Sequence, residues 1–121
     1  MLDAAATATE SRNALADRLL GEALRTENHP LIRFKGGAAG RRQPQLTGTR
    51  LYVHQVISTL RAVGGDVNEA AESIGLRPQQ VDAALAYYAD FQEEVDADAA
   101  TARDIESAER RRWERREQAL A

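Results

Sequence analysis

The chain has 121 residues, a length that suits one folded domain with some additional helix and is too short for two full cores. It contains no cysteine, which excludes a disulfide framework and thiolate metal ligands, and aromatic residues make up only 5% of it. We expect a soluble, cytoplasmic protein, since the sequence has neither a signal peptide nor an apolar run approaching the roughly 18 residues of a membrane span.

The net charge of −3 is unevenly distributed along the chain. Residues 29–50 include five basic side chains and no acidic one. Residues 51–91 include two arginines and five acidic residues, and residues 92–121 include six arginines and nine acidic residues. A basic block followed by two acidic segments indicates two different partners. The alternative is an asymmetry without functional meaning on a solvated surface.

A first helix is predicted over residues 11–28. Ser11 can cap its start, and Pro30 disfavours the helical conformation at His29. Apolar residues recur at helical spacing, namely Leu15, Leu19, Leu20, Ala23 and Leu24. Residues 1–10 have no such periodicity and are expected to be frayed. We therefore treat residues 1–28 as an N-terminal segment with one helix, a candidate for dimerisation.

A small β-hairpin is predicted next. Leu31–Phe34 and Arg41–Leu46 are two short extended segments, joined by the glycine-rich stretch Lys35–Gly40. A phosphate-binding P-loop would require a Gly-Lys-Ser/Thr ending and a following helix, whereas Arg41-Arg42-Gln43-Pro44 follows here. The stretch is therefore interpreted as a hairpin loop.

Residues 53–91 carry the clearest helical pattern and predict three helices. The first has an apolar face formed by Val53, Val56, Ile57, Leu60 and Val63, and Gly64-Gly65 ends it. Asp66 can cap a second, short helix by accepting a bond from the Glu69 amide, and Gly75 ends that helix. Pro78 suits the first position of a third helix. The inward stripe of the third helix is expected to be Val81, Leu85 and Tyr88, with Val95 as a further candidate.

The second and third of these helices fit a DNA-binding helix-turn-helix. Such a motif needs a small residue inside its first helix, a glycine at the turn and apolar residues that lock the helices together. Ala71, Gly75, Leu76, Val81 and Leu85 fill these positions. Trihelical folds that do not bind DNA share this packing, so a plain scaffold stays open as an alternative.

The third helix would then read base edges, while hairpin arginines bind phosphates. The predicted DNA-binding residues are Arg77, Gln79, Gln80 and Ala83 at the helix, and Arg41, Arg42 and Arg50 at the backbone. Three acids count against deep insertion, namely Asp82, Asp90 and Glu93. A solvated hairpin rim is the alternative for the arginines.

Residues 92–121 predict a charged C-terminal helix. Its apolar stripe is thin, so we expect it to be ordered mainly against a partner. The predicted partner-binding residues are Ile105, Arg111, Arg112, Trp113, Arg115 and Arg116. An arginine-rich solvated helix with Trp113 against its own domain is the alternative.

No convergent set of catalytic or metal-binding residues is recognisable. The two histidines, His29 and His54, make a poor metal site without cysteine, and the serines lack the context of a catalytic triad. We therefore expect neither enzymatic activity nor a cofactor. The predicted fold is mainly α, with a trihelical helix-turn-helix core, a small β-hairpin, an N-terminal helix and a long C-terminal helix. Its expected division is 1–28, 29–91 and 92–121.

Two motifs carry a resemblance to a known family. Gly48-Thr49-Arg50 and Ala84-Leu85-Ala86-Tyr87-Tyr88 match the pattern of a bacterial family catalogued as domain of unknown function four-three-three. The resemblance covers about residues 30–91. The chain departs from the pattern at Arg41-Arg42-Gln43, where Gly-Gly-Lys is common, and at Tyr52, which replaces a proline.

The family resembles VapB-type antitoxins, which implies two partners, a PIN-like ribonuclease toxin and operator DNA. Residues 14–20 are also similar to the second helix of a ribbon-helix-helix module. The acidic mouth of such a nuclease would suit the arginines of residues 110–116, with Trp113 as an apolar anchor. We therefore expect a homodimeric antitoxin and autorepressor. The alternatives are a toxin-independent transcriptional regulator and a scaffold that binds only proteins.

Overall fold

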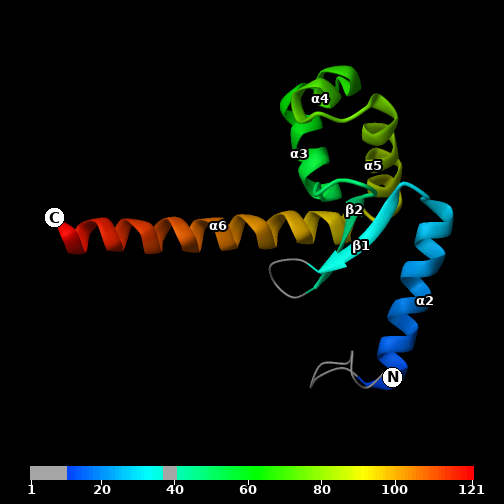
Figure 1. The fold of residues 1–121 in the computed structure, drawn as a ribbon, viewed down its shortest axis with the longest axis horizontal. Coiled ribbons are helices and arrows are strands. Elements are labelled where there is room, and N and C mark those ends of the chain that lie inside the picture. Colours follow the sequence, from blue (N-terminus) through cyan, green and yellow to red (C-terminus); the bar gives the residue numbers. More distant parts are fainter. Residues whose placement is uncertain (1–10, 37–40) are drawn as a thin grey trace.

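A computed structural model describes residues 11–36 and 41–121 and shows a mainly helical chain with one two-stranded antiparallel hairpin (Figure 1). The elements are α2 (Arg12–Asn28), β1 (Ile32–Gly36), β2 (Arg42–Leu46), α3 (Val53–Ala62), α4 (Val67–Ile74), α5 (Pro78–Asp90) and α6 (Gln92–Leu120). The predicted fraying of residues 1–10 and most of the predicted glycine-rich loop lie outside the described residues.

The hairpin is confirmed, with Ile32 paired to Leu46 and Gly36 paired to Arg42. Its first strand runs two residues beyond the predicted end at Phe34. A tight turn then leads into α3. Gly48 has a φ of +80°, a left-handed conformation that glycine adopts without strain. The Thr49 hydroxyl donates to the Leu46 carbonyl at 2.9 Å and accepts from the Leu51 amide at 3.0 Å. The Gly-Thr part of the family-like motif thus has a structural role in this turn.

The predicted end of α3, both predicted ends of α4 and the predicted start of α5 are confirmed, whereas Val95, a candidate for the inward stripe of the third helix, belongs to α6. Gly64 and Gly65 follow α3 with φ values of +68° and +87°, and the Asp66 carboxylate accepts from the Glu69 amide at 3.0 Å. Gly75 ends α4 with a φ of +71°, and Pro78 is the first residue of α5. These boundaries depend on local backbone chemistry, which is why the sequence predicts them well.

The core joins α3, α4 and α5 to the hairpin and to the first turns of α6. Val53, Val56, Val81 and Tyr87 are fully buried in it. Its other buried members are Ile32, Leu46, Ile57, Leu60, Ala70, Ala71, Ala84, Tyr88 and Val95. Because Val95 belongs to α6, the root of the C-terminal helix is part of the same core as the predicted 29–91 segment.

The predicted inward stripe of α5 is partly wrong. Leu85 is 40% exposed, and the buried face is formed by Val81, Ala84, Tyr87 and Tyr88. The Tyr87 ring packs against Phe91 with ring centres 4.7 Å apart and against the His29 ring at 5.2 Å. Because burying a tyrosine removes more apolar area from water than burying a leucine, α5 turns Tyr87 inward and Leu85 outward.

The N-terminal helix forms as predicted, and its start is capped as predicted. The Ser11 hydroxyl accepts from the Ala14 amide at 3.1 Å, and the His29 amide bonds to the Arg25 carbonyl at the other end. Its leucines, however, divide between two environments. Leu15 is fully buried, whereas Leu19, Leu20 and Leu24 are 43%, 62% and 52% exposed. The apolar face of this helix is therefore largely directed to solvent.

Candidate functional site

The two hairpin arginines predicted to bind phosphates are engaged within the protein. Arg41 donates from Nη2 to Asp98 Oδ1 at 2.8 Å. Arg42 Nε lies 2.9 and 2.7 Å from the two carboxylate oxygens of Glu22, and its Nη2 donates to the Phe34 carbonyl at 3.2 Å. DNA phosphates would have to compete with these carboxylates, which corrects the expectation that both side chains are available to bind DNA.

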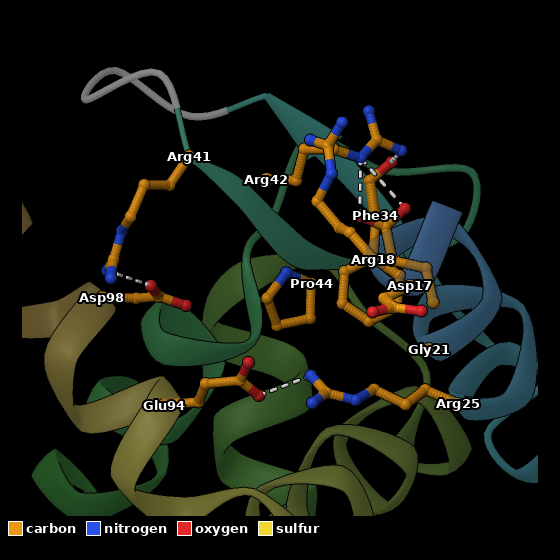
Figure 2. A pocket seen from close by; sticks show the side chains of 11 residues that line it. Asp17, Arg18, Gly21, Arg25, Phe34, Arg41, Arg42, Pro44, Glu94 and Asp98 are labelled. Carbon is orange, nitrogen blue, oxygen red and sulfur yellow. Dashed lines mark hydrogen bonds and ion pairs between the residues drawn. The ribbon is translucent and has the colours of Figure 1, made fainter. Parts of the chain in front are cut away.

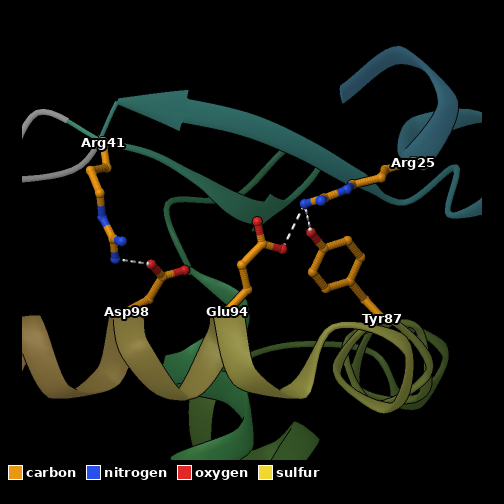
Figure 3. A network of polar contacts seen from close by, with 5 residues as sticks. All are labelled: Arg25, Arg41, Tyr87, Glu94 and Asp98. Atoms are coloured by element: carbon orange, nitrogen blue, oxygen red, sulfur yellow. Dashed lines mark hydrogen bonds and ion pairs between the residues drawn. The ribbon is translucent and has the colours of Figure 1, made fainter. Parts of the chain in front are cut away.

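A polar network lies beside these pairs at the root of α6 (Figure 3). Arg25 Nη1 donates to Glu94 at 2.6 Å and lies 3.4 Å from the Tyr87 hydroxyl. The Arg25 guanidinium also stacks over the Phe91 ring, 4.2 Å from its centre. Figure 3 shows Glu94 and Asp98 extending from the same side of α6 toward the hairpin strands. The network thus fixes the root of α6 to both α2 and the hairpin.

These side chains surround a cavity of about 490 Å³ between α2, the hairpin and α6 (Figure 2). Four arginines and four carboxylates line it, namely Arg18, Arg25, Arg41, Arg42, Asp17, Glu22, Glu94 and Asp98. The formal charges balance, so the cavity has no strong preference for an anionic or a cationic ligand. Its chemistry is that of an ion-pair network that joins three elements.

Burial shifts the pKa of two groups in this network. Desolvation raises the pKa of the Asp98 carboxyl, although the nearby Arg41 acts in the opposite direction. Desolvation also raises the pKa of Tyr87 from 10.0 to about 12, against the smaller effect of the Arg25 hydrogen bond. The Tyr87 hydroxyl is therefore held in its neutral form.

The Tyr87 shift predicts a loss of stability at alkaline pH. The unfolded chain releases the tyrosine proton near the ordinary pKa of 10.0 and the folded chain near about 12. The Tyr87 proton contributes on the order of 2–3 kcal/mol to the free energy of unfolding. This contribution is complete below pH 10 and is lost as the pH rises to about 12. Urea unfolding between pH 9 and 12 measures it. Tyr87→Phe should remove this part of the loss, and Tyr52→Phe, the control, should retain it; equal curves for both variants would contradict the assignment.

The predicted base-reading residues are not equally available. Arg77 and Gln79 are exposed at the start of α5, and Arg50 is exposed in the turn before α3. The Gln80 side chain is instead used to cap α5, since its Oε1 accepts from the Arg77 amide at 2.8 Å. Ala83 is partly buried and packs against the core. Gln80 and Ala83 thus each have a structural role in or beside α5, and their predicted contacts with DNA bases stay predictions.

The last thirteen residues, 109–121, are all exposed and form the arm of α6. Figure 1 shows this arm extending away from the other elements. Trp113 is 57% exposed and Leu120 is 88% exposed, and the Arg116 guanidinium lies 5.3 Å from the Trp113 ring centre. Arg111, Arg112 and Arg115 are exposed on the same arm. The expected alternative, with Trp113 packed against its own domain, does not agree with this position.

Ile105 differs from the other predicted partner-binding residues. It is only partly exposed and lines a small hollow with Gln43, Tyr52 and His54. Its neighbours at that hollow come from β2 and the start of α3, so Ile105 contributes to the packing of α6 on its own domain. The surface that remains for a partner therefore begins after Ile105.

Several residues of the polar network were not predicted. Arg25 and Glu94 are 69 positions apart, and Arg41 and Asp98 are 57 apart. His29 Nε2 lies 2.8 Å from Asp90 Oδ2, a carboxylate that the sequence does not place near this histidine. Local spacing carries no signal for such pairs.

Comparison of the chain with family models, with curated proteins and with solved structures gives no match. The family resemblance therefore stays a prediction. Among residues 11–36 and 41–121, no group of three or more histidines and carboxylates is placed to hold a metal ion. In the same part of the chain, no helix is long and apolar enough to cross a membrane.

Proposed function

We propose that the chain is an antitoxin, in which the arm of α6 binds and neutralises a PIN-like ribonuclease toxin. The observation that carries this proposal is the exposure of all residues from 109 to 121 in a helix whose root belongs to the core. A helix end that makes no tertiary contacts contributes little to the stability of its own fold. Its composition of five arginines, three glutamates and one tryptophan is better suited to a partner.

The arm continues the apolar face by which the first part of α6 packs on the core. Trp113 follows Val95 by 18 positions, and about five helical turns separate them, so both lie on one side of α6. Ala102, three turns before Trp113, is partly buried on this side, whereas Trp113 and Leu120 meet solvent. A partner that covers the arm would thus extend an interface that α6 already makes with its own domain.

The charge of the arm favours an acidic partner. Arginine forms forked hydrogen bonds with carboxylates, and a PIN-type nuclease holds its metal with clustered carboxylates. Residues 110–116 place five arginines around Trp113. One of these guanidinium groups would bind the metal-ligand carboxylates while Trp113 fills an apolar recess at the mouth.

A chain ending at Ala108 tests the proposal without removing any buried residue. We expect this chain to fold like the full chain and to lose inhibition of the proposed PIN-like nuclease. Inhibition of RNA cleavage is measured at equal concentrations of both forms, with their melting temperatures as the control for folding. Equal inhibition by the two forms would exclude the arm as the inhibitory element.

The same proposal includes operator binding by a helix-turn-helix formed by α4 and α5. Supporting features are the left-handed Gly75 at the turn, the buried Ala71 in the first helix and the exposed Arg77 and Gln79 at the start of the second. Arg50 is the predicted phosphate ligand that no described carboxylate holds by an ion pair. DNA binding would thus depend on Arg50, Arg77 and Gln79 more than on the paired hairpin arginines.

Substitution of Arg50 by alanine should weaken binding to every DNA sequence and lower the slope of log affinity against log salt by about 0.9. Gln79→Ala should mainly relax the sequence preference. Fluorescence anisotropy with upstream and scrambled duplexes over a range of salt measures both effects, with Arg103→Ala, an exposed arginine on α6, as the control. Absence of salt-dependent binding, with and without the nuclease, would exclude the operator-binding part. Binding to DNA without any effect on the nuclease would instead indicate a toxin-independent regulator.

A further inference from the structure

A groove of about 420 Å³ lies between α3 and the middle of α6. Figure 1 shows the start of α3 beside α6 at this place. Among the described residues, none lines both this groove and the cavity at the root of α6. The apolar part of its lining is formed by Ile57, Val95, Ala99 and Ala102. Since ligand pockets in proteins have volumes of about 300–1,000 Å³, the groove is large enough for a small molecule.

A hollow of about 130 Å³ adjoins the groove, and His54, Gln55 and Ala102 line both. The hollow is also lined by Tyr52 and Ile105. The Tyr52 and His54 rings are stacked, with an angle of 11° between their planes and 5.7 Å between their centres. Aromatic and aliphatic side chains in so small a space are suited to one flat ring system.

The hollow also contains a buried polar side chain without a partner. Gln43 of β2 is 5% exposed and lines the hollow. Its side-chain amide makes no hydrogen bond to any other described residue. An amide has two donors and one acceptor, and burying them unpaired is unfavourable. A ligand that offers a donor and an acceptor side by side would satisfy this amide.

The charges along the groove balance one another. Arg61 and Arg103 line it together with Asp96 and Glu106. Burial lowers the pKa of His54, so its ring is neutral at pH 7 and adds no charge. A lining with equal numbers of positive and negative groups favours an uncharged polar ligand over an ion.

We propose that the hollow and the groove together bind an adenine nucleoside, with the base in the hollow and the ribose in the groove. The amino group and a ring nitrogen of adenine form two hydrogen bonds with a glutamine amide, and Gln43 supplies this amide. The stacked rings of Tyr52 and His54 pack against the base. The ribose hydroxyls bond to Ser58 and to the Asp96 carboxylate, which both line the groove.

The nucleoside site is independent of the proposed antitoxin function. Its α6 residues end at Glu106, whereas the arm consists of residues 109–121. Absence of nucleoside binding would therefore leave the tests on the arm unaffected. Loss of nuclease inhibition in the chain ending at Ala108 would likewise leave the nucleoside site unaffected.

Titration of the ¹⁵N-labelled full chain with adenosine, followed by two-dimensional NMR, tests the site. We expect saturable shifts of the Gln43 side-chain amide and of residues 52–58 and 99–106, with a dissociation constant of about 1 mM or lower. Purine riboside lacks the amino group of adenosine and should bind about tenfold more weakly, since one of the two hydrogen bonds to Gln43 is lost. Adenosine 5′-monophosphate should bind no more tightly than adenosine, because the groove has no excess of positive charge.

Two results of this titration would overturn the proposal. The first is the absence of shifts up to the solubility limit of adenosine. The second is binding of adenosine 5′-monophosphate without binding of adenosine, because the arginines and not the hollow would then hold the ligand.

Gln43→Leu tests the role of the amide. Leucine is similar in size and removes only the polar atoms, so the melting temperature should not fall, whereas the affinity for adenosine should fall at least about tenfold. Gln118→Leu is the matched control, since this glutamine is exposed on the arm, and it should keep the wild-type affinity. Ala102→Leu places a larger side chain where the hollow meets the groove and should prevent binding from the α6 side. Wild-type affinity in either folded variant, Gln43→Leu or Ala102→Leu, would contradict the proposed site.

Discussion

Replacing Trp113 by alanine is expected to weaken binding to the proposed nuclease partner by about 2 kcal/mol or more, roughly a 30-fold rise in the dissociation constant. Trp113 is the one tryptophan of the chain and the largest apolar side chain on the arm. Trp113 is 57% exposed, and burial of that surface would contribute most of the apolar part of the proposed interface. The substitution should leave the melting temperature unchanged, since the ring packs on no core residue.

Titration calorimetry or inhibition curves measure the effect, and Trp113→Phe should recover part of it. Leu120→Ala is a suitable control, because it removes apolar surface from the same side of the arm near its end. Single replacements of Arg111, Arg112, Arg115 and Arg116 by alanine then show whether one guanidinium reaches the metal site, since that variant should lose much more than the other three. Wild-type affinity in Trp113→Ala would show that the tryptophan is no anchor.

The helix boundaries are the part of the fold that the sequence predicts best. Gly64-Gly65, Asp66, Gly75 and Pro78 each act on the backbone within a few residues, so their effects can be derived without knowledge of the tertiary structure. The orientation of α5 could not be derived in this way. Leu85 and Tyr87 lie about 200° apart around the helix, at opposite edges of the apolar stripe. Which of them is buried depends on the rings that Tyr87 meets, and those of His29 and Phe34 come from distant parts of the chain.

The difference between local and long-range effects also decides which features of the candidate site can be predicted from the sequence. The exposure of Trp113 and of the arginines on the arm follows from a thin apolar stripe, which is a local property of the sequence. The pairing of Arg41 with Asp98 is not local, because 15 arginines and 19 acidic residues allow many combinations. The absence of acidic residues between residues 29 and 50 predicts basic side chains that are available to a partner. In the structure, Glu22 of α2 and Asp98 of α6 supply carboxylates that bind two of these arginines.

Truncation after Phe91 is expected to destabilise the protein by at least about 3 kcal/mol, a large part of the total stability of a small domain. The apolar stripe from Val53 to Leu85 suggests by itself that such a fragment would keep a cooperatively folding core. In the structure, Val95 is 1% exposed within that core, and burying a valine contributes about 1.5–3 kcal/mol. The Tyr88 hydroxyl would also lose its bond to Asp96, which is 2.8 Å long, at about 1 kcal/mol.

Truncation after Phe91 also removes two ion pairs, and their loss destabilises the fragment further. Removal of Glu94 leaves Arg25 half-buried against the Phe91 ring without its carboxylate, and removal of Asp98 leaves Arg41 unpaired. Urea unfolding of chains ending at Phe91, at Ala108 and at Ala121 separates the root of α6 from its arm. The chain ending at Ala108 should match the full chain, because every residue after it is exposed. An equal midpoint for the chain ending at Phe91 would mean that the core does not need the root of α6, and the arm would then have to be fixed to the domain by its partner alone.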